Sequence, residues 1–367
     1  MKTVIHIVGA RPNFVKAAPI IAEMEKIDNI QNLVVHTGQH YDDKMSNVFF
    51  SELGISKPNY NLGVGSGSHA TQTASIMIGC EQIFIECDPD FIIVYGDINS
   101  CLAAALVASK MGVPIAHVES GLRSYDRTMP EEINRVITDS ISNVLFLTSF
   151  DAMANLHREG IDTNRCYVVG NTMIDSLVRL SEEFNRSKIL STLGLEKKTY
   201  ALATFHRPSN VDTASGLEKI IDIFTEISAL NTELKILFPI HPRTLNNIKK
   251  FNLLDRMNQV DGLLIEKPFG YLDFISSMKD SLFVITDSGG IQEETTFLNV
   301  PCLTYRQNTE RPVTVELGTN VLVDSISGIV ENIRSIMDGT YKRAKAIEHW
   351  DGEAAIRVTK ILSEVLS

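Results

Sequence analysis

The sequence has few cysteines and no long apolar run, and each absence removes a class of protein. Its cysteines are odd in number and show no CxxC spacing: Cys80, Cys87, Cys101, Cys166 and Cys302. Because each lies in an apolar context, buried free thiols are expected rather than disulfides or zinc ligands. No apolar stretch reaches the roughly 20 residues that span a bilayer, and the N-terminus lacks the cleavage site of a signal peptide. A reducing, cytoplasmic location without a membrane partner is therefore expected.

Positive charge is also scarce. The formal net charge of −11 argues against nucleic acid or an anionic membrane surface as the partner. No histidine–carboxylate spacing indicates a metal. The glycine-rich stretch 62–69 matches neither GxGxxG after a first strand nor GxxxxGK[ST], so it is interpreted as a mobile surface loop. Neither a metal nor a cofactor is expected, and an anionic ligand would need cations gathered locally.

Short β-rich runs alternate with helical patterns along all 367 residues, a length that suits two domains of about 150–200 residues each. The strands are expected at 3–8, 32–36, 91–95, 114–118, 144–148 and 166–169, and then at 200–204, 235–240, 262–266, 282–286, 301–305 and 320–323. Strands separated by helices indicate parallel βαβ units, hence an α/β fold of two doubly wound, Rossmann-like sheets. The boundary is expected near 170–196, where a helix at 173–184 leads into a polar segment. Ligands of such sheets bind at the carboxyl ends of the strands, so the site is expected in a cleft that the two domains face.

Residues 286–294, TDSGGIQEE, are the most informative stretch. An apolar run before them predicts a buried strand, and a helix pattern follows. A turn through Ser288, Gly289 and Gly290 into a helix presents unpaired backbone N–H groups and a positive dipole end, which suit a phosphate. Glu293 and Glu294, one turn into the helix, lie close enough to reach sugar hydroxyls. The stretch therefore fits a nucleotide diphosphate that carries a sugar.

Cationic side chains follow other strand ends. Arg11 and Lys16 come after the first strand and are interpreted as anion contacts, the alternative being a solvated cation pair. Arg311 would bring a second guanidinium to the phosphate, or is an ordinary loop arginine. His206 and His241 each end a strand of the second half. The function favoured for His206 is a hydrogen bond to a leaving phosphate, whereas a structural role for His241 is equally consistent.

Three carboxylates also follow strands. Asp97 either points towards the cleft or caps the next helix. Glu119 directly ends a buried run, a costly place for a carboxylate without a task or a partner. Glu131 and Glu132 follow Pro130, where acids commonly stabilise a helix start, and this structural role is the stronger alternative for Glu132. Asp97, Glu119 and Glu131 together would suit proton transfer at carbon, in which one group removes a proton and another returns one.

Together these motifs resemble the non-hydrolysing UDP-N-acetylglucosamine 2-epimerases over essentially the whole chain. The resemblance is carried by Gly9–Pro12, Thr37–His40, Gly96-Asp97, His117–Glu119, Pro130–Glu132, Gly170–Thr172, Asp287–Glu294 and Thr309–Pro312. It implies the two-domain fold of the GT-B glycosyltransferases. In that fold residues 1–170 form an N-terminal domain joined by a C-terminal helix at 354–367, and residues 171–353 form the UDP-binding domain. The family is usually dimeric, so a homodimer is expected.

The resemblance also implies roles for individual residues. The UDP part would be held by Arg11, Lys16, His206, Ser288, Gly289, Gly290, Glu294 and Arg311, and the uracil by Phe274 and the backbone near Phe269. The acid/base set would be Asp97, Glu119 and Glu131. UDP would leave C1 together with the C2 proton, giving a 2-acetamidoglucal. Its return with a proton on the opposite face would give UDP-N-acetylmannosamine for envelope or capsule polysaccharide.

Three positions depart from the family pattern. Pro208 replaces an arginine that contacts an activating second UDP-N-acetylglucosamine in bacterial members, next to Gln39 and His241. The segment 349–354 differs around Trp350, which bears on the hinge. Ser120 replaces a common alanine, so an epimerase of UDP-2,3-diacetamido-glucuronate remains an alternative. The motifs also leave open a hydrolysing 2-epimerase, a UDP-sugar glycosyltransferase and a non-enzymatic nucleotide-sugar sensor.

Overall fold

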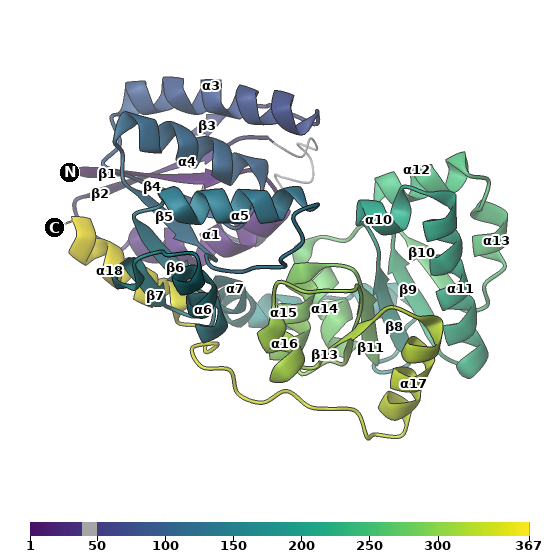
Figure 1. Cartoon of the computed structure of the whole chain (residues 1–367). Coiled ribbons are helices and arrows are strands. Elements are labelled where there is room, and N and C mark those ends of the chain that lie inside the picture. Colours follow the sequence, from purple (N-terminus) through teal and green to yellow (C-terminus); the bar gives the residue numbers. More distant parts are fainter. Residues whose placement is uncertain (39–49, 367) are drawn as a thin grey trace. The chain divides into compact units, whose positions relative to one another are not determined.

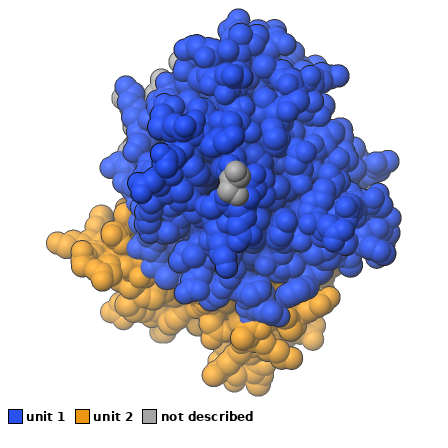
Figure 2. Space-filling model, turned by 90° about the vertical axis from the view of Figure 1, so that its left-hand side faces the viewer, with its two compact units in different colours: residues 1–180, 347–367 blue, residues 181–346 orange. Residues whose placement is uncertain are grey.

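The computed structural model describes residues 1–38 and 50–366. Their contacts divide the chain into unit 1, residues 1–180 and 347–367, and unit 2, residues 181–346 (Figures 1 and 2). Gln39 and His40, which belong to one of the sequence motifs, lie outside the described residues. Within the described part of the chain, no helix is long and apolar enough to cross a membrane.

Unit 1 is built on a wholly parallel sheet in which seven strands of the described residues pair in the order β3-β2-β1-β4-β5-β6-β7. The strands are β1 Lys2–Val8, β2 Ile30–His36, β3 Tyr60–Asn61, β4 Phe91–Tyr95, β5 Ile115–Val118, β6 Val144–Leu147 and β7 Cys166–Val168. The central strands are buried on both faces, so they contain continuous apolar runs rather than an alternating pattern.

Helices cover both faces of this sheet (Figure 1). They are α1 Arg11–Met24, α3 His69–Cys87, α4 Asn99–Met111, α5 Pro130–Ile141, α6 Phe150–Arg158, α7 Thr172–Arg179 and α18 Ala354–Leu366, with a short 3-10 turn, η1, at Thr163–Arg165. Ile76 and Phe84 of α3 pack with Ile5 and Val94 of the sheet in one core cluster. Local signals set the helix ends: Ser68 accepts a hydrogen bond from the Thr71 N–H at the start of α3.

Unit 2 has a six-stranded parallel sheet in the order β10-β9-β8-β11-β12-β13. The strands are β8 Tyr200–Thr204, β9 Lys235–Pro239, β10 Leu263–Glu266, β11 Phe283–Thr286, β12 Cys302–Tyr305 and β13 Asn320–Val323. The helices are α8 Ser181–Asn185, α9 Ile189–Leu193, α10 Pro208–Val211, α11 Ala214–Leu230, α12 Pro242–Lys250, α13 Leu254–Asn258, α14 Tyr271–Asp280, α15 Gly289–Phe297, α16 Pro312–Glu316 and α17 Ile326–Met337. Apolar residues of α11 and α17 pack on β8, β9 and β11 to form the core of this unit.

The predicted fold class is confirmed in both units, and all twelve predicted strands are present with ends shifted by no more than a few residues. Two local features differ from the prediction. The short edge strand β3 has too few residues to give a periodic signal. The helix predicted at 173–184 is two helices, α7 and α8, which meet at Leu180, and α7 packs on α1 within unit 1.

The last helix returns to unit 1, and a buried carboxylate receives it. Asp175 of α7 accepts the N–H groups of Ala354 at 3.2 Å and Ala355 at 2.6 Å, the first residues of α18. Burial raises the pKa of Asp175 to about 6, against the opposing effect of those two hydrogen bonds. Just before α18, Trp350 donates its indole N–H to the carbonyl of Thr148 at 3.0 Å. The segment that departs from the family pattern thus helps to anchor the return of the chain.

Buried His6 makes the stability of the protein depend on pH. Its Nδ1 lies 2.6 Å from the hydroxyl of Tyr95 and its Nε2 lies 3.1 Å from Oδ1 of Asn32. Burial lowers the pKa of His6 to about 4, while the hydrogen bond to Asn32 opposes this. Its unfolded value is about 6.5, so only the unfolded chain gains a proton as the pH falls below that value.

We therefore expect the His6 contribution to stability to be present above pH 6.5 and to be lost as the pH falls towards 4. Urea unfolding should show a loss of roughly 2–3 kcal/mol from this group by about pH 4.5. His6→Gln should remove that part of the pH dependence, so the difference in unfolding free energy between the two proteins should shrink on acidification. An unchanged difference between neutral and acidic pH would contradict this account.

Candidate active site

Three neighbouring strands of unit 1 end at one edge of the sheet, and the candidate residues of this unit follow them. Gly9 follows β1, Asp97 lies two residues past β4, and Glu119 directly follows β5. β4 pairs with both β1 and β5, so the ends of these strands are adjacent. Arg11 is the first residue of α1. Asp97 and Glu119 thus lie at the carboxyl ends of strands, as predicted from the sequence.

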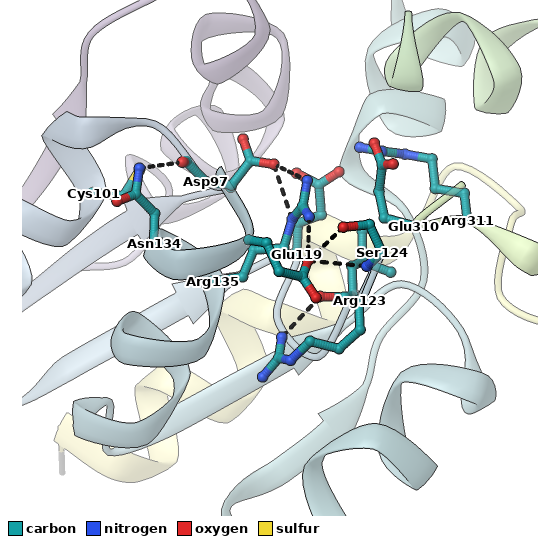
Figure 3. A network of polar contacts seen from close by, with 12 residues as sticks. Asp97, Cys101, Glu119, Arg123, Ser124, Asn134, Arg135, Glu310 and Arg311 are labelled. Carbon is teal, nitrogen blue, oxygen red and sulfur yellow. Dashed lines mark hydrogen bonds and ion pairs between the residues drawn. The ribbon is translucent and has the colours of Figure 1, made fainter. Parts of the chain in front are cut away.

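Helix α5 holds Asp97 through both its side chain and its backbone (Figure 3). Oδ2 of Asp97 accepts hydrogen bonds from Nε of Arg135 at 3.0 Å and from its terminal nitrogen Nη2 at 2.5 Å. Asn134 donates its amide to the carbonyl of Asp97 at 2.8 Å. The alternative that Asp97 caps α4 is not borne out, because the N-cap position is Ile98 and no side chain caps that helix.

Arg135 also links Asp97 to the loop before α5. Its Nη1 donates to Oε2 of Glu132 at 2.7 Å, and Glu132 accepts the N–H groups of Ser124 and Tyr125 at 2.9 and 2.8 Å. Glu132 is therefore a buried anchor for the 124–129 loop, a larger role than the stabilisation of a helix start. Glu131, its neighbour, is half-buried in the first turn of α5, where the helix dipole favours a carboxylate.

Glu119 has a buried partner of opposite charge. The ammonium group of Lys16 on α1 contacts Oε2 of Glu119, and both side chains are about one-twentieth exposed. Glu119 also has a φ of 68°, a left-handed conformation that is uncommon for a residue with a side chain and that clusters at functional sites. Gly96 leaves room for the pair, since a Cβ there would lie 2.9 Å from Nζ of Lys16. The structure thus places Lys16 beside Glu119, one of the three carboxylates predicted to transfer protons.

Ser120, one of the departures from the family pattern, is fully buried. Its hydroxyl donates to the carbonyl of Phe146 at 3.0 Å, inside the sheet. The hydroxyl is committed to the core of unit 1, so the expectation that Ser120 affects substrate choice is not supported.

In unit 2 the strand–turn–helix predicted at residues 286–294 is present. β11 ends at Thr286, Ser288 is the N-cap and α15 begins at Gly289. The first N–H groups of any helix have no intrahelical acceptor and point out of its start. The side chain of Ser288 does not cap them here. Such an end suits an anion.

The guanidinium of Arg311 lies across this helix start. A Cβ on Gly289 would lie 2.5 Å from Nη1 of Arg311, so only glycine allows this approach. Nε of Arg311 lies 2.8 Å from Oε2 of Glu293, and its Nη1 donates to Glu310 at 2.5 Å. Glu293 is thus engaged with Arg311 rather than directed at a sugar. Glu294 remains for that role, with Oε1 3.3 Å from the hydroxyl of Tyr271.

His206 follows β8 and is held by Asp287. Its Nδ1 lies 3.0 Å from Oδ1 of Asp287, and its side chain is half exposed. Asp287 also accepts the N–H of Arg207 at 2.9 Å and the amide of Asn210 at 2.9 Å. Burial opposes ionisation of Asp287, but the hydrogen bond and charge of His206, together with Asn210 and Arg207, hold its pKa below the usual value.

Replacing Asp287 by Asn should therefore destabilise unit 2 and loosen His206. Loss of a buried ionised acceptor that serves several donors costs roughly 1–3 kcal/mol, which urea unfolding at neutral pH should report. The pKa is lowered, so the contribution of this carboxylate is present above its unfolded pKa and is lost as the pH falls through the folded value. Equal stability of the two proteins at neutral pH would contradict the role given to Asp287.

Of the remaining candidate residues of unit 2, His241 has a structural role, and Phe269 and Phe274 lie at helix α14. Nδ1 of His241 accepts the N–H of Arg243 at 3.2 Å and so caps α12, which is the structural alternative predicted for it. Phe269 is half-buried just before α14, and Phe274 is buried in the second turn of that helix. Tyr271 begins the same helix and touches Glu294, so α14 and α15 bring the predicted uracil and ribose residues to one region of unit 2.

Two participants were not singled out from sequence. Arg135 lies three residues after Glu132 and four after Glu131, a spacing that puts side chains on one helix face. That spacing was the available signal. Tyr271 had none, because its contact joins α14 to a residue far along the chain. Among the described residues, no group of three or more His, Cys, Asp and Glu side chains suits a metal ion.

Comparison with known proteins gives one consistent family. The protein-family model described as UDP-N-acetylglucosamine 2-epimerase matches residues 22–363 of this chain. The UDP-N-acetylglucosamine 2-epimerase of Methanocaldococcus jannaschii is 42% identical over 361 residues, covering 97% of this chain and 98% of that protein. The UDP-2,3-diacetamido-2,3-dideoxy-D-glucuronate 2-epimerase of Pseudomonas aeruginosa is 37% identical over 366 residues, covering 99% of each. A crystal structure of the M. jannaschii enzyme in complex with UDP-GlcNAc and UDP superposes with a TM-score of 0.92 at 40% identity, covering 99% of both chains.

Proposed function

Since this chain belongs to the UDP-N-acetylglucosamine 2-epimerase family, we propose that it interconverts UDP-N-acetylglucosamine and UDP-N-acetylmannosamine without hydrolysis. The observation that carries the proposal is the pair of carboxylates at the ends of β4 and β5. Asp97 and Glu119 are each held by a buried cation, Arg135 and Lys16. A reaction at the anomeric carbon alone would not need them.

The chemistry follows from the substrate. The C2 proton beside an acetamido group is weakly acidic, so its removal requires an electron sink. In the proposal a carboxylate takes the C2 proton while the C1–O bond breaks, and the bonding pair leaves with UDP. The product is a 2-acetamidoglucal with a C1–C2 double bond. In the return step a phosphate oxygen of UDP bonds to C1 and a proton is delivered to the opposite face of C2, which completes the epimer.

The residues divide this work. Asp97, Glu119 and Glu131 of unit 1 remove and return the proton. In unit 2 the side chain of Ser288, the N–H groups of Gly289 and Gly290 and the guanidinium of Arg311 receive the charge that develops on the departing diphosphate, and His206 adds a donor. Each 1.36 kcal/mol of such stabilisation is about tenfold in rate. Arg11 is assigned to the diphosphate as well, Phe269 and Phe274 to the uracil, and Glu294 to the ribose.

Other features stay predictions of the same proposal. They are a homodimer, a cytoplasmic location, supply of the product to cell-envelope or capsular polysaccharide, and the division into domains 1–170 with 354–367 and 171–353. Neither cofactor nor metal is part of the proposed reaction. Activation by a second UDP-N-acetylglucosamine is not expected, since Pro208 offers no side-chain donor at the position where bacterial members have arginine.

The experiment is incubation with UDP-N-acetylglucosamine in D2O, followed by NMR of the products. Deuterium is expected at C2 of both epimers, with UDP-N-acetylmannosamine as the new product. Free N-acetylmannosamine would instead establish a hydrolysing enzyme. Loss of the sugar that depends on an added acceptor would establish a glycosyltransferase. Binding of the UDP-sugar without deuterium exchange at C2 would indicate a non-enzymatic sensor.

A second substrate is supported by the P. aeruginosa relative, whose name specifies UDP-2,3-diacetamido-2,3-dideoxy-D-glucuronate. The two substrates differ at C3 and by a carboxylate at C6, so a direct comparison of kcat/KM separates them. We expect the ratio to favour UDP-N-acetylglucosamine. A ratio that favours the diacetamido-glucuronate would reassign the substrate and leave the proposed chemistry at C1 and C2 intact.

A further inference from the structure

A fully buried histidine, His117, lies beneath the two carboxylates of unit 1 and belongs to none of the roles described so far. It stands in β5, two residues before Glu119. Its Nδ1 lies 2.6 Å from Oδ1 of Asp139 on α5, and its Nε2 lies 2.8 Å from the carbonyl oxygen of Gly96. Gly96 in turn immediately precedes Asp97. The imidazole thus joins the end of β4, the end of β5 and helix α5.

The two partners of this ring are both acceptors. A backbone carbonyl can only accept, and so can an ionised carboxylate. Asp139 is in the ionised form, because its other oxygen, Oδ2, accepts from the buried guanidinium of Arg123 at 2.7 Å and from the N–H of Gly121 at 3.1 Å. Both ring nitrogens must therefore donate, which only the imidazolium form can do.

His6 in the same unit shows the opposite arrangement. It is also fully buried, but its ring lies between the Tyr95 hydroxyl, which can donate, and the Asn32 carbonyl oxygen, which accepts. One donor and one acceptor match a neutral imidazole. The two buried histidines therefore differ in the charge that their surroundings require.

The charge on His117 is balanced within a compact group. Asp139 accepts through its second oxygen from the N–H of Gly121 at 3.1 Å and from Nη1 of Arg123 at 2.7 Å. Arg123 pairs with both oxygens of Glu159 at 2.7 and 2.6 Å. Two cations and two carboxylates thus sum to zero, which is the condition under which buried charges persist.

This group holds the backbone on either side of the site. Nε2 of His117 fixes the carbonyl of Gly96, where the chain has a φ of 72° just before Asp97. Asp139 fixes the N–H of Gly121, two residues after Glu119, which itself has a φ of 68°. Gly96 adopts the left-handed region without a side-chain penalty, whereas Glu119, which has a side chain, keeps that conformation only when its surroundings determine it. The side chain of Asp97 is held separately, by Arg135 one turn earlier on α5.

We propose that His117, as an imidazolium paired with Asp139, is a positioning residue that fixes the separation and orientation of Asp97 and Glu119. The inference rests on the proposed function, because it concerns the acid/base pair of that reaction. It gives His117 no contact with substrate. It also explains why a buried ion pair is retained directly below the site, where an apolar pair of similar volume would serve stability as well.

The test compares His117→Gln with His6→Gln in the full-length protein. Both variants remove a fully buried imidazole with two partners from the same sheet, so both lose stability. Only His117→Gln is expected to lower kcat, by roughly 100-fold, with KM for UDP-N-acetylglucosamine changed by less than about threefold, because misplacement of reacting groups by about 1 Å costs that much. A drop in kcat of the same size for His6→Gln, or wild-type kcat for His117→Gln, would overturn the proposal.

Two further measurements keep the result independent of folding and of the proposed function. Nitrogen-15 NMR of the unliganded wild-type protein at neutral pH should show both ring nitrogens of His117 protonated and His6 neutral, and a neutral His117 would overturn the assignment. In a double-mutant cycle His117→Gln and Asp139→Asn should be non-additive in kcat, whereas additive losses would count against a joint role. If the wild-type protein has no epimerase activity, the proposed function fails while the NMR result still decides the charge of His117.

Discussion

Glu119→Gln and Asp97→Asn are each expected to lower kcat for epimerisation by roughly a thousandfold, because general acid–base catalysis supplies about 10²–10⁴ in rate. Both substitutions keep the size of the side chain and remove its ability to hold or deliver a proton. Glu131→Gln belongs to the same set. The measurement is the steady-state rate of UDP-N-acetylmannosamine formation, with UDP binding followed by calorimetry.

UDP binding should survive these substitutions, since the diphosphate is assigned to the start of α15 and to Arg311 in unit 2. Asp90→Asn is a matched control. Asp90 lies just before the amino end of β4, at the opposite edge of the same sheet, and pairs there with Lys2 at 3.0 Å. Its loss should leave kcat within about twofold, as expected for an exposed pair remote from the chemistry. Wild-type rates in all three carboxylate variants would show that the acid/base assignment is wrong.

Lys16→Met is expected to destabilise the protein by roughly 3–5 kcal/mol, since removing one partner of a buried ion pair leaves an uncompensated charge. Lys16 and Glu119 are both almost fully buried and touch each other directly, so methionine would fill the space without matching the carboxylate. Unfolding in urea at neutral pH measures the loss. The variant should also lose most of its turnover, because Glu119 would no longer be held.

The double variant Lys16→Met/Glu119→Gln tests whether the loss of stability comes from the unpaired charge of Glu119. With no charge left on either side, its stability should recover by a few kcal/mol relative to Lys16→Met alone, while its activity should stay lost. Lys2→Met, which breaks the exposed pair with Asp90, should cost less than about 1 kcal/mol. A Lys16→Met protein as stable as that control would contradict the buried pair.

The strands and the general position of the site could be predicted from sequence because both depend on local signals. Apolar runs between helix patterns identify parallel strands, and residues just past each run must lie at one edge of the sheet. Asp97, Glu119 and Ser288 were located by that reasoning. The short strand β3 and the break at Leu180 between α7 and α8 were missed, since neither carries a periodic signal.

The partners of the site residues could not be predicted, because pairing depends on tertiary geometry. Lys16 follows the first strand and suggested an anion contact, but α1 directs it towards Glu119. Glu293 suggested a sugar contact, and Arg311, from the segment between β12 and α16, engages it. Ser120 suggested specificity, and the carbonyl of Phe146 on the neighbouring strand takes its hydroxyl. In each case the residue type was informative and its partner was set by a distant segment.

The central claim is that the nucleotide leaves C1 before the configuration at C2 is rewritten. It is tested most directly with UDP-N-acetylglucosamine labelled with oxygen-18 in the bridge between C1 and the β-phosphorus. Cleavage and return of UDP should move the label into non-bridging positions of the β-phosphate during turnover, which phosphorus-31 NMR detects. Full conversion to the epimeric mixture with the label still in the bridge would contradict the account.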